Sequence, residues 1–161
     1  MRLDPTRSGL LPSVLDRLLD DHPQGPDDRA FGYDLRQYKH AVARDLEALL
    51  NTRCIDLADH IEAHPEARRS MLSFGIPDLS SLGLLNPDDR AMLRDRIAES
   101  IKRHEPRLAN VRVALDAPRE TERMLRFRVD AVLRVHPSRP PVVFDAMLQL
   151  STNQYQVKET G

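Results

Sequence analysis

The sequence contains one cysteine, no tryptophan and six glycines, and each of these low counts excludes a class of protein. A lone Cys54 cannot form an internal disulfide or a multi-cysteine metal site. The glycines stand singly and far apart, so there is no glycine-rich phosphate loop. No apolar run approaches the roughly 18 residues of a transmembrane helix, and Pro12, Asp16 and Arg17 interrupt any secretory signal. We therefore expect a cytoplasmic protein without membrane insertion, metal or bound cofactor.

The composition is that of an ordinary globular domain, with 161 residues of which 40% are hydrophobic and 30% charged. The net charge of −1 lacks the basic excess typical of nucleic-acid-binding proteins, so no nucleic-acid partner is expected. Residues 1–34 carry four basic and seven acidic side chains, whereas residues 104–139 carry eight arginines and five acids. Opposite charges on two regions suit docking between protein subunits, and a mixed solvated surface is the alternative interpretation.

Three segments have the apolar spacing of amphipathic helices. A short helix is predicted after Pro12, with Val14, Leu15, Leu18 and Leu19 on one side. A longer helix is predicted to begin after Asp34 as N-cap and to end at Asn51. The third follows Asn86 as N-cap and ends near His104, because the proline at position 106 cannot continue it.

After the third helix the apolar period changes from 3.6 to 2, which indicates strands. The alternating segments are residues 111–115, 125–135 and 142–150. Because the helices precede the strands, we predict an α+β fold with the N-terminal helices packed on one face of a three-stranded antiparallel sheet.

A further short strand is an alternative for residues 70–75, inside a segment that otherwise reads as a loop. The expected organisation is a flexible leader at residues 1–12, one domain at residues 13–153 and a C-terminal tail at residues 154–161.

The polar face of the predicted sheet is rich in arginine. Because side chains two apart share a face of a strand, these arginines should align as a stripe that points away from the helices. The residues are Arg112, Arg126, Arg128 and Arg134. We interpret this face as a docking surface for another protein.

Glu105, Pro106 and Arg107 lie where the third helix turns into the sheet. A glutamate at a helix C-terminus faces the negative end of the dipole, at a cost of about 0.3–1 kcal/mol. Three interpretations follow. The pair forms an ion pair that pins the corner, or presents Glu105 or Arg107 to a neighbouring subunit. In the third, Glu105 is the general acid of a glycosidase, working with Asp116 or Asp130.

Four short motifs follow one another along the chain, and together they resemble one known family. They are Leu49-Leu50-Asn51-Thr52-Arg53, Ser73-Phe74-Gly75-Ile76-Pro77-Asp78-Leu79, Glu105-Pro106-Arg107-Leu108 and Val143-Phe144-Asp145. In this order they resemble the TssE family, the baseplate subunits of bacterial type VI secretion systems. That family is similar to the small wedge protein of contractile-phage baseplates and was once labelled lysozyme-like. The resemblance covers residues 13–153.

The resemblance implies a structural subunit and no enzyme. It implies a place in the wedge with TssF, TssG and TssK, at the baseplate that associates with the inner membrane from the cytoplasm. It also implies that the chain gives the first ring of the sheath proteins TssB and TssC a template for polymerisation. An unpaired sheet edge can accept a strand from another chain, which fits that role.

By resemblance, Glu105 and Arg107 are the residues expected to matter most. The alternative function is a muramidase that cleaves peptidoglycan with Glu105 as general acid, and it is motivated by Glu105 near Asp116.

Overall fold

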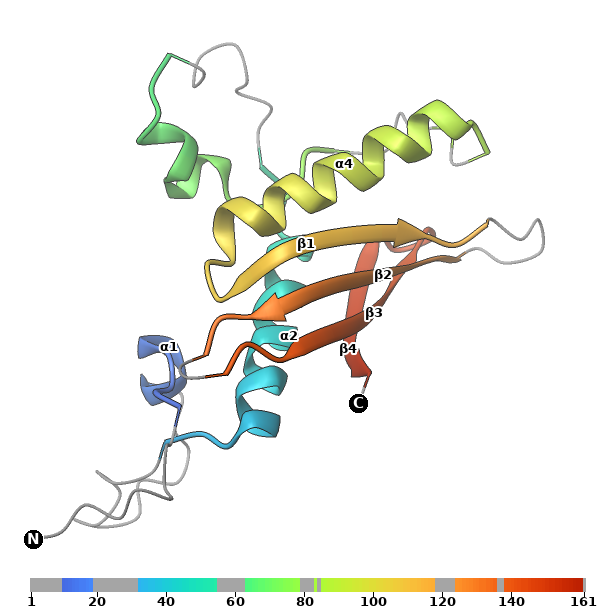
Figure 1. Cartoon of the computed structure of the whole chain (residues 1–161). Coiled ribbons are helices and arrows are strands. Elements are labelled where there is room, and N and C mark those ends of the chain that lie inside the picture. Colours follow the sequence, from blue (N-terminus) through green and yellow to red (C-terminus); the bar gives the residue numbers. More distant parts are fainter. Residues whose placement is uncertain are drawn as a thin grey trace, which may run out of the picture.

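The computed structural model describes residues 10–18, 32–54, 63–78, 83, 85–117, 124–135 and 138–160. In this part of the chain, a four-stranded antiparallel sheet carries two long helices on one face, with a short N-terminal helix beside them (Figure 1). The arrangement confirms the predicted α+β class, because helices and strands occupy separate parts of the chain. None of the described helices is long and apolar enough to span a bilayer.

The sheet is a meander in which neighbouring strands are also consecutive in the sequence. The strands are β1 (Leu108–Leu115), β2 (Met124–Leu133), β3 (Pro141–Gln149) and β4 (Gln154–Thr160). The predicted alternation is confirmed in β2, where Phe127 and Val129 are buried while Arg126 and Arg128 are exposed. Since the order is β1-β2-β3-β4, the two edges of the sheet are β1 and β4.

The prediction of three strands is wrong, because residues 154–160, expected to be part of a tail, form the fourth strand. In β4 only Tyr155 and Val157 are buried, and polar residues surround them. So short an alternation is too weak a local pattern to predict a strand. The strand exists because all of it pairs with β3 and because it packs against the helix α2 (Leu35–Asn51).

Both long helices begin where their capping residues predict. Asp34 and Gln37 form a capping box at the start of α2, with each side chain accepting the other residue's backbone N–H at 2.7 and 2.9 Å. Asn86 caps α4 (Pro87–His104) by accepting the N–H of Asp88 at 3.0 Å. Proline at the first helical position adds to this start, since that N–H would have no partner in any case.

One apolar core lies between the helices and the sheet. α2 supplies Val42, Leu46, Leu49 and Leu50, and α4 supplies Leu93, Ile97 and Ile101. The sheet supplies Phe144, which is fully buried, and Phe127, whose ring meets that of Tyr155 edge to face with the centroids 6.1 Å apart.

The segment between the long helices contains no strand at residues 70–75, so that alternative is wrong. Two 3₁₀ turns, η2 (Ala67–Arg69) and η3 (Met71–Ser73), occupy it. The side chain of Ser70 accepts the N–H of Leu72 at 3.2 Å, a local bond that competes with strand pairing. The strand-like contact lies just beyond, as an isolated bridge between Arg53 and Ile76.

Gly75 attaches this segment to both long helices. Its φ of 114° is disfavoured for any residue with a side chain, and an added Cβ would lie 2.4 Å from the Thr52 carbonyl oxygen. The Ser100 hydroxyl, from α4, donates to the Gly75 carbonyl at 2.8 Å. The next residue, Ile76, is fully buried, and its N–H donates to Thr52 at 2.9 Å.

His104, the last residue of α4, makes a second attachment. Its Nε2–H donates to the Ser73 carbonyl at 2.8 Å, and its ring meets the Phe74 ring edge to face at 5.3 Å between centroids. Burial lowers the pKa of His104, and the charge of Arg103 lowers it further, although the bond to Ser73 opposes them. The fold therefore stabilises the neutral imidazole.

Replacing Gly75 with alanine should destabilise the fold by about 2–4 kcal/mol, since it combines a strained backbone with an overpacked contact. Equilibrium urea denaturation measures the change. Gly83→Ala is the matched control, because among the described residues a Cβ there meets only side-chain atoms, the Asp89 carboxylate oxygen at 3.2 Å and the Asn86 Cβ at 4.0 Å. Equal losses in the two variants would contradict the special role of Gly75.

Lowering the pH from about 7 to 5 should cost the protein stability through His104, whose unfolded pKa is about 6.5. The folded pKa lies below that value, so the contribution is present above it and is lost as the pH falls through the folded pKa. His104→Gln keeps a donor near Ser73 but does not titrate. Its unfolding free energy, measured by urea denaturation at both pH values, should fall less than that of the parent, and an identical fall would refute the prediction.

Candidate interaction site

Glu105 is the C-cap residue that follows α4, and it is only 4% exposed. Its Oε1 accepts the backbone N–H of Arg107 at 3.1 Å and the Nε–H of the same residue at 2.7 Å, while Oε2 pairs with Arg107 Nη2. The Arg107 guanidinium thus forms a bidentate ion pair with the Glu105 carboxylate across the turn that contains Pro106. The geometry is that of the first interpretation, an ion pair at the corner between helix and strand.

Arg107 also reaches across to α2. Its Nη2 lies 2.6 Å from Asp45 Oδ2, and its guanidinium carbon lies 5.9 Å from the centroid of the Tyr38 ring. Burial by itself would lower the pKa of Arg107, but the hydrogen bonds and charges of Glu105 and Asp45 outweigh it and raise the pKa instead. The guanidinium therefore stays charged and joins α4 and β1 to α2.

The same set of charges continues to the N-terminal helix α1 (Val14–Leu18). Arg44 pairs with the other Asp45 oxygen at 2.7 Å and with Asp16 Oδ1 at 2.5 Å. The second Asp16 oxygen accepts the N–H and the hydroxyl of Ser13 at 3.0 and 2.7 Å. Burial raises the pKa of Asp16, but the bonds from Ser13 and Arg44 outweigh it, so the pKa is lowered. We call this set, Glu105, Arg107, Asp45, Arg44 and Asp16, the corner network.

The sequence indicated Glu105 and Arg107 but missed the other members of the corner network. Arg44 and Asp45 have the spacing of the solvent side of α2, and only the fold shows that Arg107 lies opposite them. Asp16 reverses the expected amphipathic pattern of α1. Its side chain is 1% exposed, whereas Val14 and Leu18 are 73% and 77% exposed.

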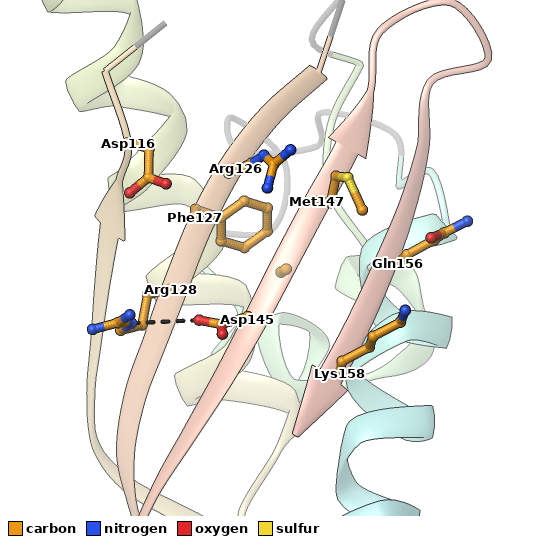
Figure 2. A pocket seen from close by; sticks show the side chains of 9 residues that line it. Asp116, Arg126, Phe127, Arg128, Asp145, Met147, Gln156 and Lys158 are labelled. Carbon is orange, nitrogen blue, oxygen red and sulfur yellow. Dashed lines mark hydrogen bonds and ion pairs between the residues drawn. The ribbon is translucent and has the colours of Figure 1, made fainter. Parts of the chain in front are cut away.

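Three of the four predicted arginines lie on the face of the sheet that no described helix covers. Arg112, Arg126 and Arg128 are exposed there. Figure 2 shows the hollow of about 250 Å³ that Arg126 and Arg128 line with Asp116, Asp145 and other side chains. Arg128 pairs with Asp145 at 3.4 Å, so acids interrupt the arginines and the expected stripe is a face of mixed charge.

Arg134 lies beyond the end of the strand that carries Arg126 and Arg128. It follows the end of β2, and its backbone N–H donates to the Arg107 carbonyl at 2.7 Å. Its side chain lines hollows beside the C-terminal end of α4 together with Lys102. One of these hollows is also lined by Arg112 and Asp130, so Arg134 lies near the corner and is not separated from the open face.

The acids named for a glycosidase are not gathered in one cleft with Glu105. Asp116 lines the hollow on the open face of the sheet, and Asp130 lines another beside β1, and neither hollow includes Glu105. Glu105 itself is held by Arg107 on the side of α2. Within the described residues, no group of three or more histidine, cysteine or acidic side chains is arranged to hold a metal ion.

The chain was compared with known families, curated proteins and solved structures. The family model for baseplate wedge protein gp25 matches residues 36–138, which is more than half of the chain. The match contains α2, α4, β1 and β2, and therefore most of the corner network. No curated protein and no solved structure matches the chain.

Removing Arg107 should destabilise the fold by about 3–5 kcal/mol, because Glu105 would remain buried without its cation. Urea denaturation of Arg107→Ala measures this loss. The double variant Glu105→Met, Arg107→Met removes both charges and keeps similar volume, so it should recover most of the loss. A single variant as stable as the parent would show that the pair does not hold the corner.

Proposed function

The chain belongs to the baseplate wedge protein gp25 family, which includes TssE, and on that premise we propose that it is a structural baseplate subunit of a type VI secretion system. Its proposed task is to connect the wedge to the contractile sheath and to template sheath polymerisation. The proposed partners are TssF, TssG and TssK in the wedge and TssB and TssC in the sheath. The proposed location is the cytoplasmic side of the inner membrane, where the baseplate assembles.

Templating by strand pairing needs a free strand edge, and the β4 edge is already used within the chain. Asn51, the last residue of α2, bonds both backbone groups of Tyr155, accepting its N–H at 2.8 Å and donating to its carbonyl at 2.9 Å. Glu47 accepts the Val157 N–H at 2.9 Å. A helix whose side chains satisfy the outer backbone groups of an edge strand leaves little for an incoming strand to pair with.

The β1 edge differs, and the sheet register shows why. The backbone N–H of Asp116 donates to the Arg126 carbonyl at 2.9 Å. Ala114 and Arg112, two and four residues earlier, therefore also direct their backbone groups towards β2. In an antiparallel ladder the residues between such positions direct their N–H and C=O groups away from the partner strand. In β1 these residues include Val113 and Leu115, whose outer backbone groups have no hydrogen-bond partner among the described residues.

This difference between the two edges is the observation that supports the proposal most directly. β1 offers a row of unpaired backbone groups, to which an extended strand of a sheath subunit can add by main-chain hydrogen bonds. β1 also follows directly from the Glu105–Arg107 corner, so the corner network fixes the position of the strand that receives the sheath.

We also propose that the chain has no enzymatic activity. A general acid needs a proton and access to its substrate, whereas both oxygens of Glu105 are engaged by Arg107 and the side chain is buried. No observation on the described residues favours the muramidase.

Val113→Pro should block strand addition, because it removes an outward N–H that the incoming strand would use. Proline is tolerated on edge strands when its missing N–H faces away from the sheet, so the chain should still fold. The matched control is Val113→Ala, which shortens the same side chain and keeps the N–H. In cells with a working secretion system, sheath assembly seen by fluorescence microscopy should be lost with proline and retained with alanine.

Co-purification with the wedge subunits provides the second measurement. Both variants should still bring down TssF and TssG, since strand addition concerns the sheath alone. Normal sheath assembly with a folded Val113→Pro protein would exclude the β1 edge as template. Failure of the parent chain to co-purify with any wedge subunit would exclude the baseplate role itself.

A further inference from the structure

A basic surface at the α4–β1 corner is not accounted for by the corner network or by the strand edge. Two adjoining hollows, each of about 750 Å³, share Lys102, Leu108 and Arg134. One of them, the first hollow, reaches Arg68 and Arg69 of η2. The other, the second hollow, is lined by residues 108–112 of β1. We call their combined lining the basic groove. Figure 1 shows η2 and η3 standing beside the C-terminal half of α4, where the first hollow lies.

The basic groove has a large excess of positive charge. The cations that line it are Arg68, Arg69, Lys102, Arg103, Arg112 and Arg134, against the acids Glu99 and Asp130. One of the six is neutralised, since Arg103 pairs with Glu99. The other five form no ion pair within the described residues.

Unpaired cations also occur elsewhere in the described residues, as at Arg36, Arg90 and Arg96, but five of them line the two adjoining hollows of the basic groove. In the corner network Arg44 and Arg107 each contact two carboxylates, and on the open face Arg128 pairs with Asp145. Lys102 and Arg103 have a local reason to be basic, because they lie in the last turn of α4, where cations stabilise the helix dipole. That reason does not extend to Arg68, Arg69, Arg112 or Arg134, which come from other elements.

The shape and lining of the groove favour an extended polypeptide. Pro65 and Pro106 supply exposed apolar surface beside the cations, and the two hollows adjoin, since they share three lining residues. Among the described residues that line the two hollows none is aromatic, so they offer no stacking platform of the kind that single-stranded nucleic acids use. The net charge of −1 for the whole chain also lacks the general attraction that nucleic-acid binding needs.

We propose that the basic groove binds an acidic, extended segment of another baseplate or sheath protein. The chemistry of the site is carried by its own charges, and only the identity of the partner's assembly rests on the proposed function. Carboxylates spaced along the segment pair with the cations, and its apolar side chains contact Pro65 and Pro106. The contact lies beside the corner network but uses none of its members.

Binding of a labelled synthetic peptide of alternating glutamate and serine tests the charge complementarity. Fluorescence anisotropy with the full chain should show binding that weakens as salt rises, because exposed charges are screened. The variant Lys102→Glu, Arg134→Glu should weaken binding by about tenfold or more, as two attractions become repulsions. The matched control Arg36→Glu, Lys158→Glu makes the same charge change on exposed residues outside the groove and should keep the parent affinity.

Several outcomes would overturn the proposal. They are no peptide binding by the parent, an equal loss in the control, or tighter binding of a single-stranded DNA oligonucleotide of the same charge. Circular dichroism melting shows whether both variants are folded. Arg68→Gln, Arg69→Gln, on η2, provides a second and independent way to weaken the groove.

Photo-crosslinking in cells separates this proposal from the proposed function. A photoreactive residue at position 102 should crosslink an acidic segment of a wedge or sheath protein, while the same residue at position 36 should not. If wedge co-purification and sheath assembly persist unchanged in Lys102→Glu, Arg134→Glu, the groove has no role in the baseplate and the inference fails, although the baseplate role stands. If the parent chain does not join the baseplate at all, the proposed function fails instead.

Discussion

A carboxylate buried at the wrong end of a helix is the constraint on which the rest of the structure depends. Glu105 adds negative charge to the C-terminus of α4, away from water, and such a group is tolerated only with a cation in contact. Arg107 supplies the cation, and its guanidinium also pairs with Asp45 on α2. Asp45 in turn positions Arg44, which holds Asp16 and α1. One local conflict therefore fixes the relative placement of three helices and the first strand.

The same placement decides which surfaces remain for partners. With α2 fixed by Asp45, its last turn lies along β4, where Asn51 and Glu47 complete the outer backbone groups of that strand. The β1 edge has no such helix side chains, and the sheet face beyond the helices has none covering it in the described part of the chain. The surfaces proposed for partners are therefore the β1 edge and the open face of the sheet, because the helices cover the other face and α2 side chains bond the β4 edge.

Features that depend on neighbours in the sequence could be predicted, and features that depend on distant contacts could not. The caps at Asp34 and Asn86 and the alternation in β2 are local, and the structure confirms them. The strand β4 escapes prediction because its stability comes from β3 and α2, and its own sequence buries only two side chains. Glu105 was found because its position breaks a local rule. Asp16 has the local capping-box spacing to Ser13, but its bond to Arg44, like the whole role of Asp45, arises only in the fold.

The balance of charge distinguishes the parts of the molecule that hold the fold from those available to a partner. Arg107 and Arg44 form ion pairs with carboxylates of the same chain, which neutralise their charge. Arg134, Lys102 and Arg68 line a hollow whose one described carboxylate, Glu99, pairs with Arg103, so they have no ion-pair partner among the described residues. An arginine whose guanidinium is satisfied internally contributes to stability, and a change there acts on folding. One that lacks an internal partner contributes little to stability, and a cluster of such residues along one groove is the charge pattern on which the proposed binding of an acidic segment rests.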